Sequence, residues 1–136
     1  MFSDASRPLY EVKANLFKGL AHPLRVRVLE VLASSAGETP VSDLLEATGL
    51  EASHLSQHLA VLRNYGLVTA ERRGNQVRYR LAYPQVADLL RVARALLAEV
   101  LQTTERQLLE QSALPDLAPP ETADATTDAA ATRTGA

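Results

Sequence analysis

Residues 41–81 read VSDLLEATGLEASHLSQHLAVLRNYGLVTAERRGNQVRYRL, and this stretch decides the fold. Its first part predicts two helices, over residues 41–48 and 52–65, separated by a turn that contains Gly49. Leu55, Leu59 and Leu62 fall at i, i+4 and i+7 of the second helix, which is the spacing of a buried face. Gly66 then suits the position just past a helix C-terminus. Two amphipathic helices joined by a glycine-containing turn are typical of a helix-turn-helix.

The last part of this stretch changes from helical to strand periodicity. Val77, Tyr79 and Leu81 alternate with arginines, as expected for a half-buried strand. Residues 67–71 predict the strand before it, and Gly74–Asn75 supplies residues that tolerate the positive φ of a hairpin turn. The sequence therefore predicts a small β-hairpin with arginines at its tip and on one face.

Further helical patterns lie on both sides of this segment. Residues 9–20 predict one helix, with Leu9, Val12, Leu16, Phe17 and Leu20 along one face. A second helix is expected to start at His22 and Pro23 and to end before Gly37 and Pro40, because proline suits the first turn of a helix.

A long helix is expected from Pro84 to about Gln111, and its apolar stripe is too long for a small domain to cover by itself. A helix of a second subunit would cover it, so we expect a homodimer. The predicted dimerisation residues are Leu9, Val12, Leu16, Leu89, Leu90, Ala93, Leu96, Leu97 and Val100.

Length and composition indicate one mostly helical domain. The chain has 136 residues, of which 46% are hydrophobic and only 4% aromatic. We expect a flexible N-terminus over residues 1–8, one domain over residues 9–112, and a disordered tail rich in Pro, Ala and Thr over residues 113–136. Cysteine is absent, which excludes disulfides and thiolate metal sites. No apolar leader or membrane span is evident, so we expect a cytoplasmic protein without a membrane partner.

The net charge of −2 hides a basic segment. Residues 52–83 carry five arginines against one glutamate, Glu71. Because the field close to a contact decides whether phosphate binds, this segment remains compatible with a nucleic-acid partner.

The polar face of the helix over 52–65 is the candidate reader of double-stranded DNA. It carries short hydroxyls and the amide of Gln57, which can bond adenine in the major groove. The arginines of the hairpin can bind phosphates or enter the minor groove. The alternatives are an ordinary solvated helix face and a charged ribbon that protects an exposed sheet edge. The candidate DNA-binding residues are Ser53, His54, Ser56, Gln57, His58, Arg63, Arg72, Arg73, Asn75, Gln76 and Arg78.

Three motifs carry a resemblance to a known family: AHPLRVRVL over residues 21–29, SQHLAVLRNYGLV over residues 56–68, and the spacing G-N-x-V-x-Y that follows. Over residues 9–101 the chain resembles the ArsR/SmtB family of dimeric winged-helix repressors. The resemblance implies a mainly α winged helix-turn-helix, with four helices, a β-hairpin wing and a fifth helix, that dimerises through its terminal helices. It further implies a homodimer that represses transcription at a palindromic operator.

Many members of this family bind metals, and here the chain departs from them. The family's Cys-x-Cys pair is replaced around Pro40 and Val41, and no histidine follows His58. Asp88 and Glu99 remain on the last helix, but two carboxylates without imidazole make a poor transition-metal site. His54 and His58 form an i,i+4 pair for which DNA contact or helix packing is the favoured interpretation over metal binding. We therefore expect no metal and no cofactor.

Three other classes of protein are compatible with parts of the sequence. A metal or redox sensor of the same fold is disfavoured by the missing cysteines and late histidines. A winged-helix module that binds protein without specific DNA binding remains the main alternative. An enzyme is disfavoured because no glycine-rich phosphate loop, metal-ligand cluster or nucleophile–base pair is recognisable. The family architecture leaves room for an unidentified small-molecule effector between the first and last helices.

Overall fold

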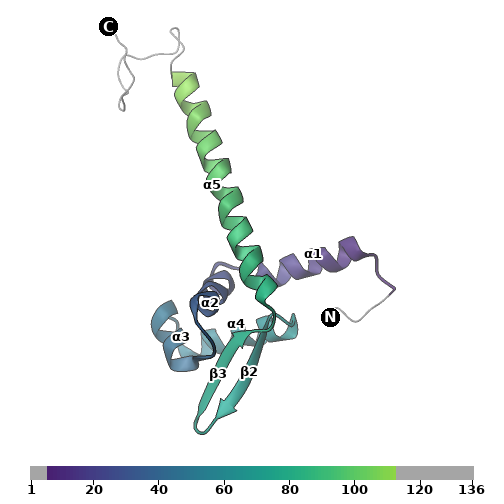
Figure 1. The fold of residues 1–136 in the computed structure, drawn as a ribbon, viewed down its shortest axis with the longest axis vertical. Coiled ribbons are helices and arrows are strands. Elements are labelled where there is room, and N and C mark those ends of the chain that lie inside the picture. The colour runs from purple at the N-terminus through teal and green to yellow at the C-terminus, as the bar shows by residue number, and fades with distance from the viewer. Residues whose placement is uncertain (1–5, 113–136) are drawn as a thin grey trace. The chain divides into compact units, whose positions relative to one another are not determined.

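A computed structural model describes residues 6–112, which form two units divided after Val92. In chain order the elements are α1 (Leu9–Leu20), α2 (Pro23–Ser34), β1 (Thr39–Pro40), α3 (Val41–Thr48), α4 (Ala52–Asn64), β2 (Val68–Arg73), β3 (Gln76–Leu81) and α5 (Pro84–Ser112) (Figure 1). The disordered tail expected over residues 113–136 lies outside the described residues, as do residues 1–5 of the expected flexible N-terminus. The mainly helical, winged fold class predicted from the sequence is confirmed.

The core of the first unit is built from leucines and valines of α2, α3 and α4. Leu29, Leu44 and Leu62 have no exposed surface, and Leu55 and Leu59 are almost completely buried. The leucine stripe predicted for α4 is therefore the face that packs on the core. His22 is the N-cap of α2, where its Nδ1 accepts a hydrogen bond from the backbone N–H of Leu24 at 3.0 Å.

The end of α4 explains why a glycine stands at position 66. Gly66 has φ of 73°, in the left-handed region that side chains disfavour. The N–H of Leu67 donates to the carbonyl of Leu62 at 3.0 Å, and the N–H of Gly66 donates to that of Arg63 at 2.9 Å. These two bonds form a Schellman motif, which ends the helix and turns the chain into the wing.

The sheet has three strands in the order β1-β3-β2, so the prediction of a two-stranded hairpin was incomplete. β1 pairs antiparallel with β3, with Thr39 opposite Tyr79 and Pro40 opposite Arg78. The sequence alone indicates Pro40 only as a break after the second helix. A proline is nevertheless tolerated in an edge strand, where its missing N–H deprives no neighbouring strand of a hydrogen bond.

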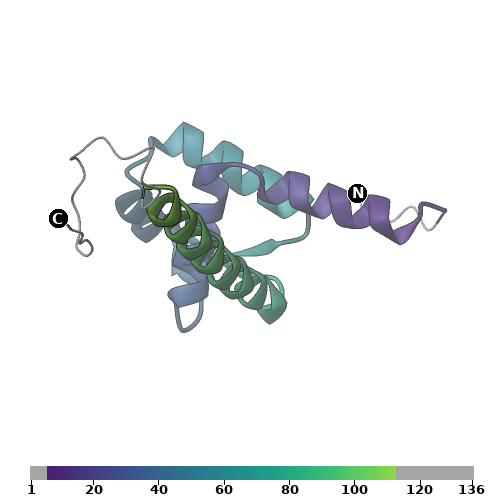
Figure 2. The same ribbon diagram turned by 90° about the horizontal axis from the view of Figure 1, so that it is seen from above.

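The C-terminal end of α1 contacts α4, while the N-terminal half of α1 extends away from the other helices of this unit (Figures 1 and 2). Tyr65 packs directly on Gly19: a Cβ at position 19 would lie 2.5 Å from the Cγ of the tyrosine ring. Arg25 binds the end of α1 as well, because its Nε donates to the carbonyl of Gly19 at 2.7 Å and its Nη2 to that of Lys18 at 3.3 Å. Of the five residues expected along one face of α1, Leu16 and Leu20 pack against the core, whereas Leu9 and Phe17 are exposed.

α5 is one continuous helix that runs through both units. In the first unit Val86 is buried and Leu90 packs against the core. In the second unit, large apolar side chains including Leu96, Leu97 and Leu101 are about 60% exposed. Within residues 6–112 no helix is both long and apolar enough to cross a membrane.

Candidate nucleic-acid interface

α4 presents a polar face opposite its buried leucines. Ser53, His54, Ser56 and Gln57 are all exposed, and no residue of α4 is acidic. Because the leucine stripe fixes the rotation of the helix, these four side chains are directed to solvent together. Hydroxyl and amide groups on one exposed helix face can reach base edges in a major groove.

His58 lies differently from the other predicted residues of α4. It is half-buried, and its ring centroid is 4.4 Å from that of His22 on α2, with the ring planes tilted by 46°. Burial, and then the nearby His22, Arg25 and His54, lower the pKa of His58 below its usual value of 6.5. His22 was interpreted from the sequence only as the start of a helix, since nothing in the sequence shows that it meets α4.

The arginines of the wing differ in their partners. The Nε of Arg73 pairs with Glu38 at 3.0 Å, and its Nη2 pairs with Glu71 at 3.7 Å. Nη2 of Arg78 donates to the side-chain oxygen of Gln76 at 3.0 Å, while its Nε is buried without a partner among the described residues. These two arginines therefore have partners within the protein; a pair between Glu71 and one of the wing arginines was expected from the sequence, whereas the pair with Glu38 was not.

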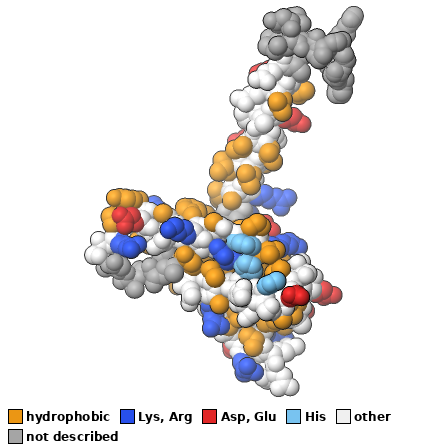
Figure 3. Space-filling model, turned by 180° about the vertical axis from the view of Figure 1, so that it is seen from behind, with side chains coloured by type: hydrophobic (Ala, Val, Ile, Leu, Met, Phe, Trp, Pro, Cys, Tyr) orange, Lys and Arg blue, Asp and Glu red, His pale blue; other side chains and the backbone are white. Residues whose placement is uncertain are grey.

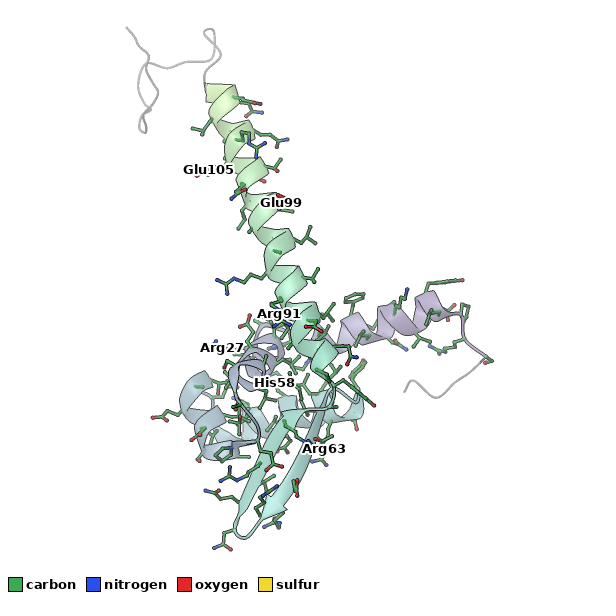
Figure 4. All side chains as sticks on the ribbon, in the orientation of Figure 1. Arg27, His58, Arg63, Arg91, Glu99 and Glu105 are labelled. Carbon is green, nitrogen blue, oxygen red and sulfur yellow. The ribbon has the colours of Figure 1, made fainter. Side chains whose placement is uncertain are left out.

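Other predicted residues remain open to a ligand. Arg72 and Asn75 are exposed near the tip of the wing, and Arg63 is exposed in the last turn of α4. In the described part of the chain, neither Arg72 nor Arg63 makes an ion pair or a side-chain hydrogen bond. Figure 4 labels His58, at the middle of α4, and Arg63, in its last turn.

An apolar groove of about 590 Å³ lies beside this interface, within the first unit. Leu9, Val12 and Leu16 line it from α1, and Leu89 lines it from α5, so four of the predicted dimerisation residues meet there. The other predicted dimerisation residues do not line it: Leu90 packs against the core, whereas Ala93, Leu96, Leu97 and Val100 are exposed on the part of α5 that belongs to the second unit. The lining residues that sequence reasoning missed are Lys13, Leu20, Tyr65, Gly66, Leu67, Tyr83, Gln85 and Val86.

The residues considered as metal ligands do not assemble into a site. Among the described residues, no group of three or more His, Cys, Asp or Glu side chains is arranged to hold a metal ion. Asp88 is instead paired with Arg91 on the same helix, and Glu99 lies exposed on α5.

Comparison with known proteins identifies the family. Residues 22–70 match the family described as bacterial regulatory protein, arsR family. An uncharacterized HTH-type transcriptional regulator of Mycobacterium tuberculosis, Rv0081, is 52% identical over 99 residues, which are 71% of this chain and 83% of the relative. Its crystal structure superimposes with a TM-score of 0.66 at 50% identity, over 73% of this chain and 98% of that one.

Two further relatives have names that are informative. A probable mercury resistance operon repressor of Streptomyces lividans is 35% identical over 89 residues, 65% of this chain and 70% of the relative. The homodimeric winged helix-turn-helix DNA-binding domain of Mb0332 from Mycobacterium bovis, solved by NMR, has a TM-score of 0.63 at 32% identity, over 73% of this chain and 94% of that one. The chain described here belongs to the ArsR family and is a DNA-binding transcriptional regulator.

Proposed function

We propose that the chain acts as a homodimeric repressor that binds a palindromic operator in double-stranded DNA. The observation that carries this proposal is the exposed face of α4, where Ser53, Ser56 and Gln57 project beside a wing that carries the exposed Arg72. In this arrangement α4 reads bases in the major groove, and the wing contacts the backbone or the adjacent minor groove. Arg73 and Arg78, which already have partners within the protein, support the wing more than they contact DNA.

The dimer is supported by apolar surface that one subunit leaves uncovered. Leu9 is 67% exposed at the groove, and Leu97 is 59% exposed on α5. Exposed leucines repeated along a helix are typical of a surface that packs on another subunit. A two-fold dimer places its two reading helices about one turn of B-DNA apart, which is why the expected operator is an inverted repeat.

The proposal assigns no enzymatic step, metal or cofactor to the chain, and places its activity with the DNA in the cytoplasm. An effector of unidentified structure is included only as a ligand that would favour a DNA-incompetent dimer. The second candidate function is a winged-helix module that binds a protein partner. It is distinguished by the DNA-binding experiment below, because such a module would have no salt-dependent affinity for a duplex.

The test is fluorescence anisotropy with labelled duplexes from the region upstream of the gene and with scrambled duplexes of the same composition, at several salt concentrations. We expect tighter binding to the upstream duplex and a steep decrease in affinity with salt. Gln57→Ala should reduce the preference over the scrambled duplex, by about 1–3 kcal/mol if the amide makes a bidentate base contact. Arg27→Ala is the matched control, because Arg27 lies exposed on α2 and pairs with Glu30 on the same helix.

Two results would contradict the proposal. A folded dimer that binds neither duplex at low salt would favour the protein-interaction module. A Gln57→Ala variant that binds both duplexes as the unsubstituted protein does would exclude α4 as the reading helix. Equal loss in the Arg27→Ala control would show that the assay reports folding rather than recognition.

A further inference from the structure

The three histidines of the chain lie close together on one face of the first unit. His54 and His58 are one helical turn apart on α4, and His22 caps α2 with its ring against that of His58. Figure 3 shows the histidine side chains gathered on one face of the molecule. Two elements that are distant in the sequence thus bring imidazoles beside the polar face of α4.

Arg25 on α2 supplies a permanent positive charge beside this histidine cluster. The charged and titratable groups that act on His58 are His22 and Arg25 from α2 and His54 from α4, and none of them is acidic. Among the described residues the carboxylate that reaches the cluster is Glu51, whose Oε1 lies 4.0 Å from Nδ1 of His54. Glu51 is 81% exposed, so solvent screens this pair and it offsets little of the positive charge. A cluster of this composition is suited to an anion.

The hydrogen bond that caps α2 determines what His22 can offer. Nδ1 of His22 accepts from the N–H of Leu24, so in the neutral ring Nε2 carries the proton and is a donor. Among the described residues the ring of His58 makes no hydrogen bond of this kind. The pair therefore combines one imidazole oriented by a helix cap with a second imidazole that has both nitrogens available.

We propose that His22 and His58, with His54 beside them, bind a phosphate of the DNA backbone, and that His58 takes up a proton when it does so. This inference rests on the proposed placement of α4 in the major groove and adds a contact from α2, outside the helix-turn-helix. A phosphate beside His58 supplies the negative charge that its neighbours lack, which favours the imidazolium form. DNA binding and proton binding are then linked, and each strengthens the other.

A metal ion is the competing occupant of a histidine cluster. As the side chains stand, the described residues contain no group of three ligands arranged to hold a metal, even though three histidines are close. His22 also uses Nδ1 for its helix cap, which leaves it one nitrogen for any ligand. The geometry thus favours a phosphate, which needs only donors directed toward it, over a metal, which needs converging lone pairs.

The test measures DNA affinity between pH 6 and pH 8 at constant ionic strength, together with proton uptake from calorimetry in buffers of different ionisation enthalpy. We expect affinity to rise as the pH falls, by up to about tenfold per pH unit for each proton fully linked to binding. His58→Gln should remove most of this dependence. His22→Asn keeps a good helix N-cap and should weaken binding a few-fold while leaving proton uptake in place.

The outcomes separate this inference from the proposed function. Binding that is specific, independent of pH and free of proton uptake in the unsubstituted protein would overturn the phosphate contact and leave the regulator intact. No duplex binding at any pH would overturn the proposed function itself. Stoichiometric Zn²⁺ binding that is lost in His58→Gln would overturn the inference in favour of a metal site.

Discussion

The contact between Gly19 and Tyr65 gives the most direct test of the packing described above. In Gly19→Ala the new Cβ would lie 2.5–2.8 Å from Cγ, Cδ1 and Cδ2 of the Tyr65 ring. Real Cβ atoms do not approach other atoms so closely, so α1 or the ring must move by roughly 1 Å. Overpacking of this kind typically costs about 1–3 kcal/mol. Alanine recovers up to about 1 kcal/mol through its higher helix propensity, and less than this near a helix end.

We therefore expect Gly19→Ala to lower the free energy of unfolding by about 1–2 kcal/mol. The measurement is urea-induced unfolding at one fixed protein concentration, because dimerisation makes apparent stability depend on concentration. Gly37→Ala is the matched control, since no atom lies within 4 Å of a Cβ at that position. It should change stability by less than about 0.5 kcal/mol.

A double-mutant cycle tests the physical reason for this loss. In a Tyr65→Ala background the ring is absent, so Gly19→Ala should be neutral or stabilising. An equal cost with and without the ring would refute the clash, as would a neutral effect in the unsubstituted background. Either result would mean that α1 is not held against the end of α4 in the way described.

Three further outcomes follow from individual side chains. Arg72→Ala should weaken binding to all duplexes and reduce by about 1 the slope of log affinity against log salt concentration, measured by salt titration. Arg73→Ala should instead lower the free energy of unfolding by less than about 1 kcal/mol, measured by urea unfolding, because it loses the pair with Glu38. The pKa of His58 is lowered in the folded protein, so the unfolded chain binds more protons and the free energy of unfolding decreases as the pH falls below 6.5. Urea unfolding between pH 7.5 and pH 5 should therefore show a smaller decrease in His58→Gln than in the unsubstituted protein. An equal decrease in both would contradict the cause given for the lowered pKa. Leu97→Glu should shift the monomer–dimer equilibrium, measured by sedimentation equilibrium, toward the monomer, because it places a charge on the exposed apolar stripe of α5. An unchanged dimer would place the interface elsewhere.

Features that depend on short sequence separations could be predicted. The rotation of α4 followed from the spacing of Leu55, Leu59 and Leu62, and its end followed from Gly66, because both are local consequences of helix geometry. The exposed candidates Ser53 and Gln57 follow from the same rotation. The spacing of the leucines alone therefore predicts which side of α4 is buried, without reference to the rest of the chain.

Features that depend on distant contacts were missed for a physical reason. A strand of two residues such as β1 has no periodicity of its own, and it exists only because β3 supplies its partner. The contact of His22 with His58 likewise joins two helices whose relative position is set by the core between them. No local pattern at either residue distinguishes an exposed histidine from one that is packed against another ring.

The wing shows how such distant contacts alter a prediction made from charge alone. Residues alternate between the faces of a strand, so Glu71 and Arg73 share one face of β2 and Arg72 lies on the other. Glu38, just before β1, and Glu71 both pair with Arg73, so the charge of this arginine is offset from within the protein, while Arg78 and Arg80 of β3 share the same face. Arg72 stands opposite Val77, on the same face as the buried Tyr79, which packs toward the helices of the core. Arg72, the wing arginine for which the described residues supply no ion pair or side-chain hydrogen bond, thus shares a face with residues that pack on the core and yet is itself exposed.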